Sequence, residues 1–219
     1  MAMLCTSFFN QDSCELARQL LGKVIRRKYR QYWLSARIIE TEAYYFAEKG
    51  SHASLGFTEK RKALFMPAGT IYMYYARGSD SLNISSQGKG NAVLIKSAFP
   101  FEDQLTHPDA IKIMQQLNPL PSGMIRPEKK LCNGQTLLCR ALHLKVPDWD
   151  QKQFDSTCFY LDDIKYQPDK VIQTTRLGIP PGRDEHLPYR FIDYNFAPYS
   201  SSNPLTKRKS IPWSLSECF

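Results

Sequence analysis

The sequence predicts an α+β fold: a single mixed domain in which a curved antiparallel sheet is flanked by helices. Apolar residues alternate with period two in several stretches that are joined by short turns, as in antiparallel strands. Helical periodicity is confined to short segments before and between these stretches. The 219 residues show no internal repeat and no clear linker, and this length suits one domain with a sizeable core. One domain is therefore expected over residues 1–196. A basic C-terminal tail containing Ser and Pro follows over 197–219 and is expected to be mobile.

The elements are expected in the following order. A first helix starts after a cap at Asp12 or Ser13, and Gly22 stands where a glycine commonly follows a helix. Strands follow over residues 23–29, 33–44, 70–76, 82–86 and 92–98, with a basic loop over 45–69. Turns near Arg30 and over 87–91 make their neighbouring strands antiparallel. Further helices are expected from Pro108 and over 134–142, and short strands near 158–161, 171–177 and 189–193.

Composition restricts the class of protein. The net charge of +8 favours an anionic partner, with nucleic acid first and an anionic membrane surface second, although many proteins of this size are basic without such a role. No apolar run approaches the roughly 18 residues of a membrane span, and the N-terminus lacks the pattern of a signal peptide. The six cysteines form no C-x-x-C pair, so free thiols in a reducing compartment are expected. No metal is expected, because no zinc-ligand spacing is present.

Polar residues with catalytic potential are concentrated between Arg37 and Lys96. In the strand over 33–44, alternation places a row of residues on one face: Leu34, Ala36, Ile38, Glu40, Glu42 and Tyr44. A carboxylate at the end of an apolar row is partly desolvated, which raises its pKa and suits a general acid or base. A solvated strand end is the more frequent explanation for a single glutamate.

An aromatic cluster follows on the next strand. Tyr72 and Tyr74 share a face, and Tyr75 points the other way. Near His52 and a carboxylate, such tyrosines form a slot for a flat heterocycle, such as a base extruded from DNA. Sheet tyrosines with hydrated hydroxyls and an ordinary loop histidine explain the same residues. Asn83 opens a neighbouring strand, where it is placed to read or reject a base edge.

Several motifs together are more specific than any of these residues. They are I-E-T-E-A-Y at 39–44, S-H at 51–52, G-T-I-Y at 69–72, N-I-S-S-Q-G at 83–88 and V-L-I at 93–95, with L-L-G-K-V at 20–24 and weaker matches at 131–142 and 176–178. With these motifs the chain resembles the alkyladenine DNA glycosylase family, the mammalian type of 3-methyladenine DNA glycosylase. The resemblance spans most of residues 8–195.

The resemblance implies a mixed α/β domain without metal or cofactor. It implies a monofunctional enzyme that excises alkylated or deaminated purines, of the 3-methyladenine or hypoxanthine type, from double-stranded DNA. Glu42 matches the residue that activates a water, which attacks C1′ while the base leaves and the sugar gains oxocarbenium character. No lysine matches a nucleophile of the family, so no Schiff-base lyase step is expected.

The resemblance also assigns the base-binding residues. Tyr44, His52 and Tyr74 match the residues that sandwich the flipped base, and Tyr72 matches a partner that orients the histidine. Asn83 matches the residue that disfavours guanine by crowding its 2-amino group.

The chain departs from the family at the residue that fills the gap left by the flipped nucleotide. Equal spacing from Gly69 places Arg77 where the family has a tyrosine wedge. Arginine can occupy the gap, touch phosphates and stack on bases, but it is a poorer apolar wedge. Tyr75 is the alternative wedge.

Other departures lie nearby. Lys96 replaces an arginine that helps to position the catalytic site, and the family's T-P-R-N becomes T-E-K-R at 58–61. The segments 78–82 and 45–51 are each one residue shorter than in the family.

Basic residues in the predicted loops are candidates for contacts to DNA phosphates. The protein is expected to be a monomer. It is expected in the cytoplasm with the nucleoid if bacterial, and in the nucleus if eukaryotic. The alternative is a protein that binds damaged nucleic acid without catalysing a reaction. The replacement of the wedge tyrosine by Arg77 supports this alternative, and the retained carboxylate of Glu42 argues against it. The candidate phosphate contacts are Lys60, Arg61, Lys62, Arg77, Lys89, Arg126, Lys129, Lys130 and Arg176.

Overall fold

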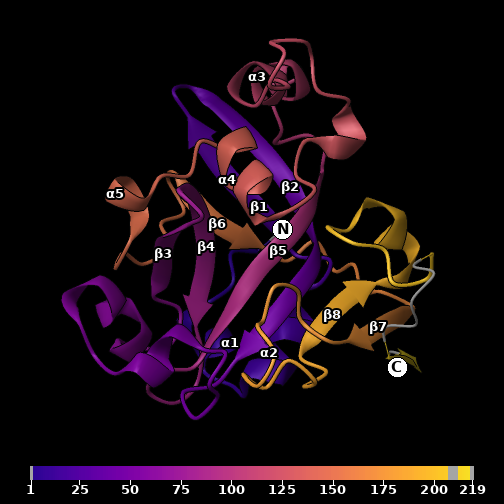
Figure 1. Ribbon diagram of the computed structural model, residues 1–219. Coiled ribbons are helices and arrows are strands. Elements are labelled where there is room, and N and C mark those ends of the chain that lie inside the picture. The colour runs from indigo at the N-terminus through magenta and orange to yellow at the C-terminus, as the bar shows by residue number, and fades with distance from the viewer. Residues whose placement is uncertain (1, 207–211, 218–219) are drawn as a thin grey trace.

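A computed structural model describes residues 2–206 and 212–217, and it confirms the α+β class and the single domain. One large antiparallel sheet is the framework, and short helices lie against it (Figure 1). Its strands are β1 (Val24–Tyr29), β2 (Tyr32–Tyr44), β3 (Ile71–Ala76), β4 (Ser79–Ser85), β5 (Ala92–Pro100), β6 (Phe159–Asp162), β7 (Lys170–Thr174), β8 (Arg190–Asp193) and β9 (Trp213–Glu217).

The long strand β2 organises this sheet. It pairs with β1 along its first half and with β8 near its end, while β5 runs along its other edge. The strand order is β3-β4-β5-β2-β8-β7-β9, with β1 joining β2 to β6. Residues at the C-terminal end of β2 therefore lie between β5 and β8, deep inside the molecule.

Short helices pack against different strands of the sheet, with α2 (Ser13–Leu20) against β2 and β5 and α4 (Gln135–Ala141) against β4 and β5 (Figure 1). In α2, Asp12 accepts hydrogen bonds from the first backbone N–H groups, which satisfies donors that have no partner inside the helix. Leu16, Ala17 and Leu20 of this helix are buried against β2 and β5. The other helical segments are α1 (Thr6–Phe9), α3 (Ala110–Leu117), α4 (Gln135–Ala141) and α5 (Val146–Trp149), with 3-10 helices η1 (His52–Leu55), η2 (Glu59–Phe65), η3 (Glu128–Lys130) and η4 (Tyr194–Tyr199).

The prediction of a loop over 45–69 is only partly correct. This region contains η1 and η2, whose short turns bury Ala53, Ala63 and Leu64 against Tyr72. Asn83 also lies inside its strand rather than at the start, because β4 begins at Ser79.

The expected row of side chains along β2 is wrong. The pairing of β2 with β5 shifts between Ile38 and Thr41, so the alternation changes sides there. Leu34, Ala36 and Ile38 consequently share the core with Ala43. Glu40 and Glu42 turn to the opposite face, where polar partners replace apolar contacts.

The expectation of a mobile tail over 197–219 does not hold for residues 197–206 and 212–217, which the structure describes. Ser201 donates two hydrogen bonds to Glu40, from its backbone N–H at 2.7 Å and from its hydroxyl at 2.8 Å. Strand β9 pairs with β7 in register from Lys170 to Thr174. These segments belong to the domain, whereas the basic run 207–209 lies outside the described residues.

The described chain contains no helix that is both long and apolar enough to cross a membrane. The cysteines in this part of the chain are free: Cys5, Cys14, Cys132, Cys139 and Cys158. The described residues also contain no group of three or more side chains suited to hold a metal ion.

Candidate active site

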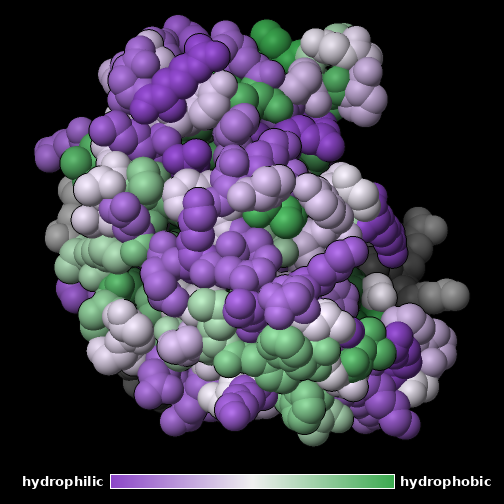
Figure 2. Space-filling model, turned by 90° about the vertical axis from the view of Figure 1, so that its left-hand side faces the viewer, coloured by the Kyte–Doolittle hydropathy of each residue, from purple (hydrophilic) through white to green (hydrophobic). Residues whose placement is uncertain are grey.

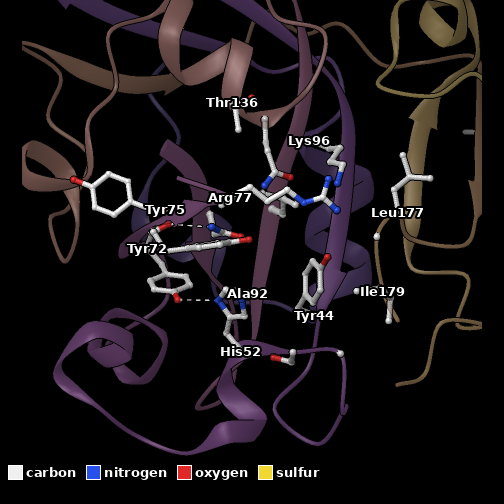
Figure 3. A pocket seen from close by; sticks show the side chains of 18 of the residues that line it. Tyr44, His52, Tyr72, Tyr75, Arg77, Ala92, Lys96, Thr136, Leu177 and Ile179 are labelled. Carbon is white, nitrogen blue, oxygen red and sulfur yellow. Dashed lines mark hydrogen bonds between the residues drawn. The ribbon is translucent and has the colours of Figure 1, made fainter. Parts of the chain in front are cut away.

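A cavity of about 910 Å³ opens between the C-terminal end of β2, the β3–β4 hairpin, η1 and the segment 177–183. Its volume lies within the range of small-molecule sites. Figure 3 shows Tyr44 on one side of this cavity and Tyr72 and His52 on the other, with Lys96 above them.

Glu42 lies beside this cavity with its side chain fully buried. Its Oε2 accepts a hydrogen bond from the Tyr44 hydroxyl at 2.7 Å. Its Oε1 accepts one from the backbone N–H of Leu177 at 3.1 Å and lies 3.3 Å from the Lys96 ammonium. A carboxylate has about four lone-pair directions, so these three contacts leave one direction unused.

The charge state of Glu42 follows from these contacts. Burial by itself raises the pKa of a carboxyl group, but here the Lys96 ammonium, the Leu177 N–H and the Tyr44 hydroxyl outweigh it. The pKa of Glu42 is therefore lowered, which corrects the raised pKa expected from the sequence. Glu42 is ionised at neutral pH, which suits a base and not an acid.

Tyr44 stays protonated in this arrangement. Its pKa is well above the ordinary value, because the hydroxyl is buried and lies beside the Glu42 carboxylate. The hydroxyl thus donates to Glu42, and the ring forms one wall of the cavity.

The opposite wall is aromatic. Tyr72 and Tyr74 stack with ring centroids 5.5 Å apart, and His52 meets the Tyr74 ring edge-on at 4.3 Å. His52 Nδ1 lies 3.1 Å from the Tyr72 hydroxyl, within hydrogen-bond distance. Partial burial, followed by the nearby Arg61 and Arg183, lowers the pKa of His52, so the ring is neutral at neutral pH.

Asn83 is one of the residues that line the cavity and is 5% exposed. Its amide Nδ2 donates to the Tyr72 carbonyl at 3.2 Å, which fixes the orientation of the side chain. The side chain is therefore a fixed part of the cavity lining.

A buried network that the sequence analysis missed supports this end of β2. The Glu40 carboxylate accepts from Arg190 Nε at 2.6 Å and from the Ser97 hydroxyl at 2.6 Å, in addition to Ser201. Glu40 and Arg190 are both fully buried. The first Glu of E-T-E-A-Y was the only sign of this network in the sequence. Its partners Ser97, Arg190 and Ser201 are far away along the chain, so the residues next to Glu40 do not identify them. The network joins β2, β5, β8 and the segment after η4.

Comparisons with known proteins identify the family of this chain. The sequence profile of the family described as methylpurine-DNA glycosylase (MPG) matches residues 7–196. The chain belongs to the methylpurine-DNA glycosylase family. Several bacterial relatives carry the name "Putative 3-methyladenine DNA glycosylase". One from Pseudomonas savastanoi pv. phaseolicola is 62% identical over 94% of this chain and 92% of its own length. One from Pseudomonas aeruginosa (strain LESB58) is 59% identical over 92% of this chain and 84% of its own. A relative of the same name from Clostridium beijerinckii is 31% identical over 86% of this chain and 94% of its own.

In this methylpurine-DNA glycosylase family member, Arg77 and Tyr75 lie at the mouth of the cavity. Arg77 occupies the turn between β3 and β4 with a φ of 49°, and its side chain is exposed. A Cβ placed on Gly178 would lie 3.9 Å from Arg77 Nη2, so the arginine extends across the mouth toward the opposite wall. Tyr75 is 58% exposed and points away from the cavity, as Figure 3 shows. Both wedge candidates are thus on the same hairpin.

Lys96, which stands where the family has an arginine that helps to position the catalytic site, lines the cavity. Its side chain is only 12% exposed and lies against Glu42. Its ammonium is thus placed to lower the pKa of Glu42.

Arg176 was predicted to contact DNA, and this prediction is wrong. Its side chain is completely buried, where it forms an ion pair with Glu48 and donates to the Ala43 carbonyl at 2.9 Å. Its guanidinium also lies 4.5 Å from the centroid of the Tyr44 ring. A cation held in this way supports Tyr44 and is not accessible to a phosphate. Arg126 is likewise buried, and it donates to backbone carbonyls.

The remaining candidate cations lie on the surface. Lys60 is exposed, and Arg61 donates to the His52 carbonyl at 3.3 Å, which places it beside the cavity. The other exposed members of the predicted set are Lys62, Lys89, Lys129 and Lys130.

Proposed function

We propose that this protein is a monofunctional DNA glycosylase that hydrolyses the N-glycosidic bond of alkylated or deaminated purines and leaves an abasic site. The observation that carries the proposal is Glu42: a fully buried carboxylate, kept ionised beside an aromatic slot. A pocket that only recognised a base would gain little from a negative charge facing anionic DNA.

In the proposed reaction, the flipped purine lies between Tyr44 and the Tyr74–His52 wall. A water molecule donates a hydrogen bond to the free lone pair of Glu42 and loses that proton to the carboxylate as it attacks C1′. The negative charge of Glu42 also stabilises the oxocarbenium character of the sugar. The electron pair of the broken C1′–N bond leaves with the base.

Lys96 does not act as a nucleophile in this proposal. Its Nζ is paired with Glu42 at 3.3 Å, and an ammonium has no lone pair with which to form a Schiff base. Borohydride treatment with DNA containing an abasic site should therefore trap no covalent complex, and a trapped complex would contradict the hydrolytic mechanism.

The proposed substrates are 3-methyladenine and hypoxanthine in double-stranded DNA. The stacking walls accept any purine, and Asn83 in the cavity lining disfavours the 2-amino group of guanine. The same residues are proposed to act in a monomer, since every wall of the cavity comes from one chain. As the named relatives are bacterial, the proposed location is the cytoplasm, at the nucleoid.

The deciding experiment uses labelled duplexes with one hypoxanthine, and in parallel duplexes with methylated purines. Hot alkali then reveals abasic sites. We expect cleavage at the lesion, and Glu42→Gln should lower excision by about 10²- to 10⁴-fold while lesion binding is retained. Tight lesion binding without any cleavage by the wild type would favour the alternative, a protein that recognises damage without chemistry.

A further inference from the structure

A second exposed feature lies at the mouth of the cavity, on an element other than the β3–β4 hairpin. Leu55, the last residue of η1, is 63% exposed and lines the cavity mouth. Phe57, two residues later, is 58% exposed. We call these two residues the apolar lip.

The apolar lip turns in open space at Gly56 and is anchored through Phe57. Gly56 between the two residues has a φ of 79°, and a Cβ added there would meet no atom within 4 Å, so the chain turns in open space. Phe57 packs edge-on against Phe65 with centroids 5.6 Å apart, and Phe65 belongs to the same apolar cluster as Tyr72 and Tyr74. The lip is thus braced by the same cluster that backs the base slot.

The surface around the apolar lip combines apolar and cationic groups. Figure 2 faces the side of the molecule that carries η1 and η2, and apolar side chains gather over its lower part. Lys60, Arg61 and Lys62 follow Phe57 closely in η2. Apolar tips next to cations match the two components of DNA, the stacked bases and the phosphates.

We propose that Leu55 and Phe57 press into the base stack beside the flipped nucleotide and help to hold the duplex open. The proposal rests on the proposed glycosylase function. It assigns part of the wedge role to residues outside the β3–β4 hairpin. On that hairpin, the candidate wedge Arg77 carries a charged side chain and not an apolar one. The lip is continuous with the cavity through Leu55, so an inserted side chain meets the bases adjacent to the extruded one.

The test compares the double variant Leu55→Ala/Phe57→Ala with Ile125→Ala, which removes an apolar side chain that is 71% exposed on a loop outside the cavity lining. Release of methylated purines is measured from methylated duplex and single-stranded DNA. The lip variant should excise about ten-fold more slowly from the duplex and within two-fold of wild type from the single strand, where no stack must be opened. Equal losses on both DNAs, or a duplex rate equal to that of Ile125→Ala, would overturn the proposal.

A second readout does not depend on excision. A duplex with a tetrahydrofuran abasic analogue carries 2-aminopurine as the neighbouring base, whose fluorescence rises when it unstacks. Wild type and Ile125→Ala should raise the fluorescence on binding, and the lip variant should raise it much less at saturation. If the wild type excised no base but still raised the fluorescence more than the lip variant did, the proposed glycosylase function would be wrong and the proposed role of the lip would be supported. An unchanged fluorescence response, with self-association lost only in the lip variant, would assign the lip to a second copy of the chain and overturn the proposal.

Discussion

Glu42 keeps its charge in a fully buried position because donors from three parts of the chain reach its two oxygens. Tyr44 lies two residues away on the same strand, Lys96 comes from β5, and Leu177 follows β7. The folded-state pKa of Glu42 is lowered, so its ionised form stabilises the fold at pH values above its unfolded pKa. That contribution is lost as the pH falls through the folded-state pKa. Catalysis by a carboxylate base should persist to the same acidic limit.

Removing the Lys96 ammonium should raise the pKa of Glu42, since burial is then opposed by fewer groups. In Lys96→Met, the acidic limb of the kcat/KM profile should therefore move to higher pH. The activity of the variant relative to wild type should be lowest at acidic pH and should recover toward neutral pH. Lys96→Arg keeps the charge and should keep the limb near its wild-type position. The measurement is excision from a lesion duplex across the acidic range. A loss in Lys96→Met that is equal at every pH would indicate a contact to DNA instead.

At the scale of elements, the site depends on a pair of irregularities in neighbouring strands. The register between β2 and β5 shifts on both sides of Glu40: the first shift adds one residue to β2, between Ile38 and Glu40, and the second adds one to β5, between Ile95 and Ser97. Each extra residue turns the rest of its own strand to the other face of the sheet. The shift places Glu40 opposite Ser97 and lets Glu42 face Lys96. The carboxylates gain polar partners in this way, while Thr41 and Ala43 take the positions against α2 and the core.

Glu40 should be essential to this arrangement. Glu40→Ala leaves the Arg190 guanidinium buried without its partner, and breaking a buried pair in this way costs about 3–5 kcal/mol. The free energy of unfolding, measured in urea, should fall by that amount. Glu59→Ala on the exposed surface of η2 is the control and should change it by less than about 0.5 kcal/mol. A small effect of Glu40→Ala would mean that the network contributes little to stability.

At the scale of the whole molecule, the 29 lysines and arginines are of two kinds, buried and exposed. Arg26, Arg176 and Arg190 are buried and are used by carboxylates inside the fold. The surface cations are the ones that remain for an anionic partner. A count of basic residues therefore overstates the charge that faces DNA.

DNA affinity should fall with salt, with a log–log slope of about −0.9 for each phosphate neutralised on duplex DNA. Lys60→Ala should reduce the size of that slope by about one phosphate. Lys112→Ala removes an exposed cation from α3 that is paired with Asp109, and the slope should not change. Affinity measured between low and physiological salt checks both variants, and a slope that is flat in the wild type would contradict nucleic acid as the partner.

The sequence by itself determined the fold class, most strand positions and the residues of the slot, because these depend on local periodicity and on contiguous motifs such as E-T-E-A-Y. Only the tertiary structure decided the charge state and surroundings of those residues. The Leu177 N–H reaches Glu42 across 135 positions, and the Ser201 N–H reaches Glu40 across 161. Arg176 and Arg77 are the same residue type, but one is buried in an ion pair and the other is exposed at the mouth of the cavity. Burial, pairing and strand register depend on which distant segments meet, and local sequence patterns carry no information about that.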